Sequence, residues 1–285
     1  MGPMTSGPRP VSVVVPAHNE GAGIRRALDL LTSGFPEREV EVIVACNGCT
    51  DDTAEVARAF PDVVVLEIPE ASKRLAMKAA DEVATHGVRA YQDADIAVSR
   101  QDLLALVDAL NDVTIVTGPE RRLSLDASSW AVRWYYDVWK RLPSVREGLF
   151  GRGLIVLAPE AHERVRGLPL VMSDDLAISE AFSSGERKVV PGVYATIEAP
   201  RTVRDLIRRR IRIATGNTQL DQLGMRSAVA RTSVRDLIRI ASASPALVAK
   251  VAVFVAITGM GRVLARQRVR RGDYTTWSRD DSSRR

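Results

Sequence analysis

The sequence predicts an α/β protein with a mainly parallel sheet, helices on both of its faces, and a basic helical extension at its C-terminal end. Three observations predict this class. Apolar runs of strand length alternate with segments of helical spacing along the first 200 residues. Those runs are nearly continuous, which is typical of strands buried on both faces of a parallel sheet. Beyond residue 200, basic helical patterns follow one another without an intervening strand.

The elements follow one another at short intervals. Strands are expected at residues 11–15, 40–45, 63–66, 88–91, 113–117 and 154–157. Helices are expected at 24–31, 53–60, 75–83, 102–110, 124–141 and 174–183, and then at 201–222 and 233–271. The chain is therefore expected to comprise a flexible N-terminal segment (1–10), an α/β domain (11–200) and a basic helical region (201–285). Parallel sheets bind ligands beyond the carboxyl ends of their strands, so the residues after each strand are the first candidates for a site.

Charge is unevenly distributed along the chain. Residues 201–285 carry 19 Lys and Arg against 6 Asp and Glu, whereas the first 200 residues carry 21 against 29. The net charge of the whole chain is only +5, so we expect no nucleic-acid partner. The basic region is the part that would meet an anionic surface.

The N-terminal residues and the cysteines bear on the compartment. Residues 1–10 hold no apolar run, so we expect neither a signal peptide nor a membrane anchor there, and a cytoplasmic protein. Cys46 and Cys49 are the two cysteines, and the three histidines show no paired spacing that would complete a zinc site. Both thiols are therefore expected to be reduced.

Polar loops follow the first two strands. The first strand ends in PAHNE (16–20) and the second in NGCTDDT (47–53), where Asn19 and Thr50 are expected to cap the helices that follow. On neighbouring parallel strands, the two loops would place amides, carboxylates and helix N-termini around one nucleotide-sized crevice. A dinucleotide-binding fingerprint is excluded, because Arg26 stands where its third glycine should be.

Two acidic pairs are candidates for chemistry. Asp93 and Asp95 directly follow the fourth strand, and they can converge on one cation only where the backbone turns. Their oxygens suit Mg²⁺ or Mn²⁺, although a solvated turn is the alternative. Asp174 and Asp175 begin a predicted helix behind Ser173. They either stabilise the helix N-terminus or supply a general base.

Taken together, these motifs resemble those of the family 2 glycosyltransferases. The resemblance rests on VVVPAHNE (13–20), NGCTDDT (47–53), DAD (93–95) and SDDL (173–176), and covers about residues 10–220. It implies the GT-A nucleotide-diphospho-sugar transferase fold and an inverting enzyme that moves a sugar from a nucleotide diphosphate to an acceptor hydroxyl. It also implies that Pro16, His18, Glu20, Asn47, Asp51 and Lys73 bind the nucleoside, that Asp93 and Asp95 bind metal and diphosphate, and that Asp175 is the base beside Asp174.

Two departures from the family pattern matter. Cys46 and Asn47 stand where the family usually has paired aspartates, which leaves the nucleotide open. Residues 209–213 resemble the QxxRW motif of processive members, but with Arg209 for Gln and Ile213 for Trp, so we expect a non-processive enzyme. Arg212 is expected to contact the diphosphate, whereas the triplet 208–210 is either part of the site or a solvated basic face.

Aromatic residues point to the acceptor. Four aromatic residues fall within ten positions and form two helical i, i+4 pairs, Trp130 with Trp134 and Tyr135 with Trp139. They either pack their helix onto the sheet or form a wall for an acceptor sugar or lipid. Phe150 and Gly151 belong to a glycine-containing loop that could close over the same site. The acceptor itself, whether a glycan, a lipid-linked group or a small molecule, is not identified by these residues.

The C-terminal region contains a long apolar run. Residues 246–261 are apolar except for Lys250 and Thr258, and five arginines follow within ten residues. Sixteen residues are short for a spanning helix. Three alternatives remain: a helix on an anionic membrane, peripheral at the inner face of the cell membrane; a homodimer interface; and packing within the chain.

The sequence thus predicts a metal-dependent, inverting, non-processive glycosyltransferase. Two other functions stay open: a non-catalytic nucleotide-binding protein that recruits a partner to the membrane, and a sugar-phosphate nucleotidyltransferase. The latter lacks the basic Gly-rich N-terminal loop expected for a triphosphate substrate.

Overall fold

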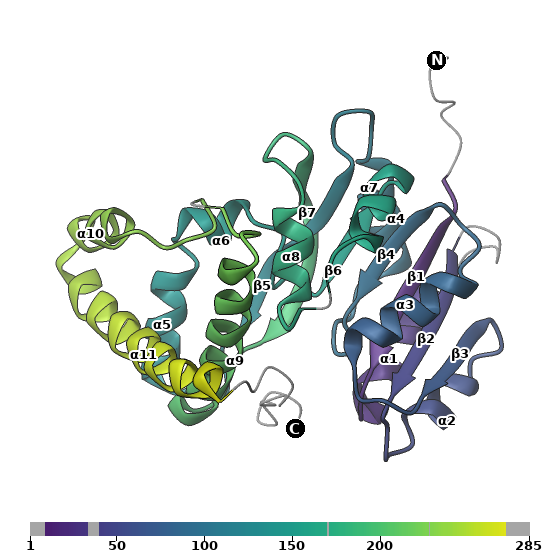
Figure 1. Ribbon diagram of the computed structural model, residues 1–285, viewed down its shortest axis with the longest axis horizontal. Coiled ribbons are helices and arrows are strands. Elements are labelled where there is room, and N and C mark those ends of the chain that lie inside the picture. Colours follow the sequence, from purple (N-terminus) through teal and green to yellow (C-terminus); the bar gives the residue numbers. More distant parts are fainter. Residues whose placement is uncertain (1–8, 34–39, 170, 228, 272–285) are drawn as a thin grey trace. The chain divides into compact units, whose positions relative to one another are not determined.

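The computed structural model describes residues 9–33, 40–169, 171–227 and 229–271 (Figure 1). The chain divides into two compact units. The first comprises residues up to 122 together with 152–167 and 183–196, and the second comprises 123–151, 168–182 and everything from 197 onward. The expectations for residues 1–8 and 272–285 lie outside the described residues.

A seven-stranded sheet forms the centre of the first unit, and the last residues of two of its strands belong to the second. Its strands are β1 (Val11–Ala17), β2 (Val40–Asn47), β3 (Val63–Ile68), β4 (Val88–Gln92), β5 (Val116–Ser124), β6 (Leu154–Leu157) and β7 (Arg187–Glu198), in the order β3-β2-β1-β4-β6-β5-β7. The pairs β1–β2, β1–β4 and β2–β3 are parallel, whereas β6 runs antiparallel to β4 and β5. The sheet is therefore mainly parallel over the strands that come first in the chain.

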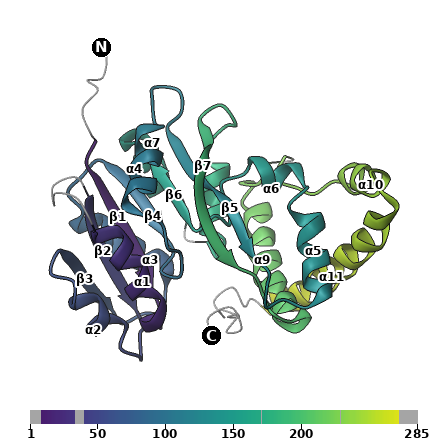
Figure 2. The same ribbon diagram turned by 180° about the vertical axis from the view of Figure 1, so that it is seen from behind.

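Helices cover both faces of this sheet. The first unit contains α1 (Gly21–Thr32), α2 (Thr53–Arg58), α3 (Lys73–Val83), α4 (Arg100–Asp108) and α7 (Pro159–Arg166). Helix α3 lies in front of the sheet in Figure 1, and α1 lies in front of it in Figure 2, which is drawn from behind. Every residue of β1 is buried, as expected for a strand covered on both sides. The predicted fold class is confirmed.

Three expected elements differ from the observed ones, and one of them is the helix expected at 233–271, which is interrupted at residues 243 and 244 and forms two helices. The helix expected at 124–141 covers only Trp130–Trp139, and the strand expected at 113–117 runs from Val116 to Ser124. The sequence analysis missed β7 altogether, because Pro191 and Gly192 interrupt its apolar pattern. Proline lacks the N–H that a central strand needs, and β7 is the last strand of the sheet, where proline is tolerated.

The second unit is mostly helical. It contains α5 (Trp130–Trp139), α6 (Pro143–Glu147), α8 (Asp174–Glu180), α9 (Val203–Gln222), α10 (Val234–Ser242) and α11 (Pro245–Arg270). Helix α11 packs against α9 and α5. Phe254 of α11 stacks on Tyr135 of α5, with 4.8 Å between ring centroids. The inner face of α11 therefore packs within the chain and forms part of a core with α5 and α9.

An ion pair adds to this contact. Lys250 of α11 donates to Asp137 of α5 at 2.7 Å. Burial alone would raise the pKa of Asp137, but hydrogen bonds from Lys250, Lys140 and Arg141 outweigh burial and hold it well below its usual value. The carboxylate therefore stays charged, and the pair persists, throughout the neutral pH range.

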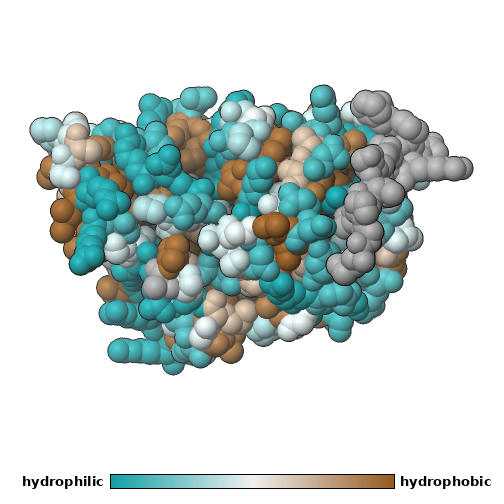
Figure 3. Space-filling model, turned by 90° about the horizontal axis from the view of Figure 1, so that it is seen from above, coloured by the Kyte–Doolittle hydropathy of each residue, from teal (hydrophilic) through white to brown (hydrophobic). Residues whose placement is uncertain are grey.

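The outer face of α11 is apolar and exposed. Val248, Val255, Met260, Val263 and Leu264 expose 37–56% of their surface there. In Figure 3, brown apolar residues gather at the end of the second unit where α10 and α11 lie. Among the described residues, this helix alone is long and apolar enough to span a membrane by length and composition, and 22% of its most apolar stretch is buried. The 26-residue helix is longer than the run of 16 on which the sequence analysis based its expectation.

Candidate active site

In the first unit, side chains join the loops that follow β1 and β2. These strands pair in parallel, with Ala17 opposite Cys46. The Thr50 N–H donates to Asn19 Oδ1 at 2.7 Å, and Asn19 Nδ2 donates to Thr50 Oγ1 at 3.2 Å. Asn19 has a φ of +53°, a left-handed conformation that asparagine tolerates well. The expectation that Asn19 and Thr50 cap helices is wrong, because each uses its side chain to bond the other loop.

His18 and Asn47 add to the same junction. The His18 ring Nδ1 lies 2.5 Å from the Asn47 carbonyl oxygen. Because a carbonyl only accepts, Nδ1 carries the proton and donates it. The Asn47 side chain donates to the Ala17 carbonyl at 2.8 Å and is buried, so its amide nitrogen fixes the end of β2 to β1. Pro16 is buried within β1 itself.

Glu20 and Asp51 place the helices that follow these loops. The Glu20 N–H donates to Thr53 Oγ1 at 2.8 Å, and the Gly21 N–H donates to Asp51 Oδ2 at 3.2 Å. Burial would raise the pKa of Asp51, but hydrogen bonds from Thr53 and Gly21 outweigh it and lower the pKa. Asp51 therefore stays a carboxylate that holds the starts of α1 and α2 together.

Both cysteines are free thiols. Cys46 is buried in β2, and burial raises its pKa to about 12. The thiol therefore stays protonated and unreactive near neutral pH. The expectation of two reduced cysteines is confirmed.

The segment after β4 turns where the cation site was expected. The Ile96 N–H donates to the Asp93 carbonyl at 3.0 Å, which closes a turn that contains Asp95. Asp93 N–H donates to the Gly153 carbonyl at 2.8 Å. Gly153 has a φ of +70°, and a Cβ there would lie 2.3 Å from Ile96, so only glycine fits beneath this turn. Lys73, at the start of α3, donates to Asp93 Oδ1 at 2.7 Å, which brings two predicted donor-binding residues together.

The donor set of this turn suits a hard divalent cation. Asp93 is partly exposed and Asp95 is exposed, so carboxylate oxygens are presented at the surface of one turn. Within the described parts of the chain, no three His, Cys, Asp or Glu side chains gather to form a complete metal site. Mg²⁺ and Mn²⁺ are commonly held by one or two carboxylates, with substrate phosphates and water completing the coordination. Asp93 and Asp95 fit a cation that is completed in this way.

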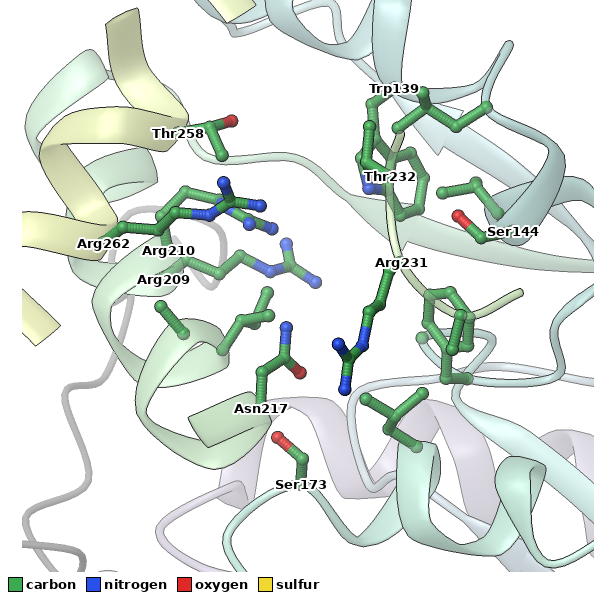
Figure 4. A pocket seen from close by; sticks show the side chains of 18 of the residues that line it. Trp139, Ser144, Ser173, Arg209, Arg210, Asn217, Arg231, Thr232, Thr258 and Arg262 are labelled. Carbon is green, nitrogen blue, oxygen red and sulfur yellow. The ribbon is translucent and has the colours of Figure 1, made fainter. Parts of the chain in front are cut away.

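The second unit contains a cavity of about 460 Å³ (Figure 4). Residues of α5, α8, α9 and α11 line it, together with the loop before β6 and the segment between α9 and α10. Asp175, Phe150 and Gly151 are among the lining residues, whereas Asp174 is buried and does not line the cavity. The cavity thus brings one of the two adjacent carboxylates together with the glycine-containing loop.

The loop holds the Asp175 carboxylate directly. The Gly151 N–H donates to Asp175 Oδ2 at 2.6 Å, and the Leu176 N–H donates to Oδ1 at 2.8 Å. Gly151 has a φ of +61°, which glycine adopts without strain. Ser173 occupies the N-cap position of α8, but its side chain makes no capping hydrogen bond.

Helix α9 positions the segment that precedes α8. A Cβ at Gly216 would lie 2.1 Å from Ser173 Oγ, so α9 and this segment touch at a point that only glycine permits. Three residues further along α9, Gln219 Oε1 accepts the Met172 N–H at 2.9 Å. The backbone on both sides of Ser173 is therefore anchored to α9.

The aromatic wall of the cavity contains two of the four expected residues. Tyr135 and Trp139 line it, together with Tyr136. Trp130 and Trp134 pack edge-to-face on each other, with Trp130 64% exposed, and neither lines the cavity. The i, i+4 spacing of the tryptophans predicted the helix, but it did not determine which face of the helix turns inward.

The QxxRW-like segment of α9 is split between two environments. Arg209 and Ile213, which stand for Gln and Trp, line the cavity together with Arg210. Arg212 is half-buried and is not a lining residue, and Arg208 pairs with Asp205 at 3.3 Å. Arg209 and Arg210 are therefore not part of a solvated basic face.

The sequence analysis missed several lining residues. They are Ser144, Asn217, Thr218, Arg226, Arg231 and Thr232, together with Arg262 and Arg266 from α11. These residues come from segments far apart in the chain, and no local pattern connects them. Gly216 and Gly261 were available signals, because a glycine inside a helix often marks a close contact with another segment.

Residues 12–152 match the model of the family described as glycosyl transferase family 2. A curated relative, glycosyltransferase AglE of Haloferax volcanii, is 31% identical over 97 residues, which cover 32% of each protein. The match therefore spans about a third of that relative's length.

Solved structures share the fold. A mannosyltransferase from Pyrobaculum calidifontis, in complex with GDP-mannose and Mn²⁺, aligns with a TM-score of 0.67 and 21% identity, over 95% of this chain and 90% of its own. A glucosyl-3-phosphoglycerate synthase from Mycobacterium tuberculosis, in complex with Mn²⁺, UDP and its product, aligns with a TM-score of 0.52 and 20% identity, over 77% and 82%. The fold of this chain is thus that of the GT-A glycosyltransferases.

Proposed function

Because the chain belongs to the family 2 glycosyltransferases, we propose that it transfers a sugar from a nucleoside diphosphate donor to an acceptor hydroxyl. One observation carries this proposal. The loops after β1, β2 and β4 bear most of the residues that are expected to bind the donor, and these strands are neighbours in the parallel part of the sheet. Their carboxyl ends therefore meet at one edge, where α/β sheets bind nucleotides.

In this proposal, the chain's own residues supply the chemistry. Lys73 and the turn at Asp93 contact the donor, and a divalent cation bound by Asp93 and Asp95 would neutralise charge on the diphosphate. Asp175 accepts the proton of the acceptor hydroxyl, whose oxygen attacks the anomeric carbon as its bond to the diphosphate breaks. Attack from the face opposite the leaving group inverts the anomeric centre. Asp175 is preferred to Asp174 because it lines the cavity and Asp174 does not.

We infer single-sugar transfer from the same cavity. Ile213 occupies the position of the tryptophan in processive members, and it lines the cavity. An aliphatic side chain offers no flat face on which a growing sugar chain could stack. The product is therefore expected to leave after one transfer.

Release of nucleoside diphosphate tests the proposed function. The full chain, with Mn²⁺ or Mg²⁺, is incubated with a panel of nucleotide sugars that includes GDP-mannose and UDP-glucose. At least one donor should release its diphosphate, and release should require the cation. A chain that binds nucleoside diphosphate but turns over no donor would instead favour a binding protein, and pyrophosphate release from a triphosphate and a sugar phosphate would favour a nucleotidyltransferase.

We further propose that the second unit binds an anionic membrane surface through α10 and α11. Val234 and Ile238 of α10 expose 72% and 62% of their surface, and the outer face of α11 is likewise apolar. Arg235 and Arg239 stand beside them on α10 and are exposed. Apolar side chains flanked by arginines are typical of helices that lie in a membrane interface.

Vesicle binding tests the membrane contact. A double variant that carries Val255→Glu and Val263→Glu should lower the affinity of the full chain for anionic vesicles by about tenfold or more. It replaces exposed apolar side chains with negative charges, which anionic lipids repel. Truncation before α11 is less informative, since it would also remove Phe254 from the core. Val113→Glu, at a more exposed valine of the first unit, is the control.

The salt dependence of vesicle binding and the molecular mass in solution distinguish a membrane contact from a homodimer interface. Binding of the unaltered chain should weaken as salt rises, while a residual apolar contribution persists. Absence of vesicle binding by the unaltered chain would contradict the proposal. A dimer whose mass falls in the double variant, with no effect of lipid, would assign the outer face of α11 to a homodimer interface.

A further inference from the structure

The cavity of the second unit is lined by more positive than negative side chains. Its lining arginines are Arg209 and Arg210 of α9, Arg226 and Arg231 of the segment after α9, and Arg262 and Arg266 of α11. The acidic residues of the lining are Asp175 and Asp221. Asp221 pairs with Arg226 at 3.3 Å and with Arg231 at 2.8 Å. Across the residues that the structure places, Arg210 and Arg262 form no ion pair.

The arginines converge on one space. Figure 4 shows the side chains of Arg209, Arg210 and Arg262 directed into the cavity from one side and Arg231 entering it from the other. Arg210 Nε is buried and has no hydrogen-bond partner, and the same is true of Thr258 Oγ1 in the same lining. Buried donors in native proteins normally have a partner, so these atoms indicate a ligand or ordered water.

The helix crossing explains why Arg210 and Arg262 meet. A Cβ at Gly261 would lie 2.8 Å from Arg210 Cβ, so α11 crosses α9 at this pair of residues. The next residue, Arg262, is thereby placed beside Arg210. Two guanidinium groups at a close helix crossing repel each other unless an anion lies between them.

The electrostatic environment of Arg226 agrees with this excess of positive charge. Burial is the largest influence and lowers its pKa, and Arg231 and Arg262 lower it further, whereas Asp221 opposes them. The positive groups of the cavity therefore interact with one another despite the neighbouring carboxylate.

The opposite wall of the cavity is aromatic and apolar. It includes Tyr135, Tyr136, Trp139 and Phe150. Aromatic rings pack well against sugar rings and aliphatic chains, while the arginines face them across the cavity. The cavity thus suits a molecule with one anionic group and a less polar remainder.

We propose that this cavity binds the acceptor through a phosphate group, which Arg210 and Arg262 contact while the aromatic wall contacts the rest of the molecule. The inference rests on the proposed function, because Asp175, its general base, lines the same cavity. Phosphate fits better than a carboxylate, since its three terminal oxygens can accept from several guanidinium forks at once.

Binding of inorganic phosphate to the full chain, without donor, is the first test. Phosphate should raise the melting temperature more than sodium chloride of equal ionic strength does. Arg210→Gln and Arg262→Gln should each weaken phosphate binding about tenfold, the loss of one charge-assisted contact. Arg204→Gln removes an exposed arginine of α9 that does not line the cavity, and should leave phosphate binding unchanged.

A second measurement tests whether Arg210 and Arg262 bind the acceptor or the nucleoside diphosphate donor. The two variants should bind nucleoside diphosphate and Mn²⁺ as the unaltered chain does. If they lose nucleoside diphosphate binding instead, the arginines serve the donor and the proposal is overturned. The proposal is also overturned if a variant that carries both Arg210→Gln and Arg262→Gln still binds phosphate with unchanged affinity. A chain that binds phosphate through these arginines but turns over no donor would support the anion site and contradict the proposed function.

Vesicles distinguish a lipid phosphate from a soluble one. Phosphatidylcholine vesicles with phosphatidic acid, a phosphate monoester, are compared with vesicles of matched surface charge that contain phosphatidylglycerol, a diester. Tighter binding to phosphatidic acid that is lost in the Arg210 and Arg262 variants would identify a lipid-borne phosphate. Equal binding to both vesicles, together with the phosphate effect in solution, would identify a soluble phosphorylated acceptor.

Discussion

Asp175→Asn is expected to lower kcat by about 10²-fold or more while leaving donor binding unchanged. Asparagine has nearly the same shape and keeps an oxygen that accepts the Gly151 N–H, so the loop should stay in place, whereas its amide nitrogen cannot accept the Leu176 N–H and this bond at the start of α8 is lost. It cannot accept a proton at neutral pH, and the acceptor hydroxyl would lose its base. Single-turnover kinetics, with donor affinity measured separately, separate the two effects.

Asp174→Asn is the matched control, because it changes the adjacent carboxylate, which is buried away from the cavity. Its kcat should fall much less. A larger loss in Asp174→Asn would show that the two carboxylates have been assigned in the wrong order. An effect of Asp175→Asn on KM alone would place this residue in binding.

Asp95→Ala is expected to abolish the metal-dependent part of nucleoside diphosphate binding. Asp95 is exposed, so its removal should not unfold the turn, which is closed by the backbone bond between Ile96 and Asp93. In the unaltered chain, Mn²⁺ should tighten binding strongly, since Asp93 would otherwise repel a diphosphate. In the variant, titrations with Mn²⁺ and with a chelator should give the same dissociation constant.

Asp62→Ala serves as its control, because this aspartate is also exposed in the first unit but lies outside the loops of the site. It should show the full effect of Mn²⁺. The melting temperatures of both variants should match that of the unaltered chain. Undiminished transfer by Asp95→Ala in Mn²⁺ would exclude the assigned role.

The donor-side loops could be predicted because their signals are local. A run such as that of β1 (Val11–Ala17), followed by polar turn residues, predicts both a buried strand and a loop at its carboxyl end. The turn between Asp93 and Ile96 could be predicted for the same reason, because polar residues directly follow a buried strand there. What the loops do was less predictable: Asn19 and Thr50 have ordinary capping side chains, and only tertiary pairing shows that they bond each other.

The cavity of the second unit could not be predicted in the same way. Arg210, Arg231 and Arg262 lie on three segments, and each belongs to a pattern with an ordinary explanation, such as a basic helix face. Helical spacing likewise predicted α5 but not its inward face, so Trp130 and Trp134 were grouped with Tyr135 and Trp139, and only the latter two line the cavity. Pairings between distant segments leave no periodic trace in a single sequence.

Gly216 has a consequence for the folding of α9. In the interior of a helix, glycine costs about 1 kcal/mol relative to alanine, because the unfolded chain loses more backbone freedom there. Helix α9 is therefore intrinsically less stable than an alanine-containing equivalent, and its docking on Ser173 must supply the difference. The Met172 N–H is hydrogen-bonded to Gln219 of the same helix, and Asp175 lies three residues further along the chain. Fraying of α9 and loss of order at Asp175 are therefore linked equilibria. Amide hydrogen exchange should report the two segments opening together.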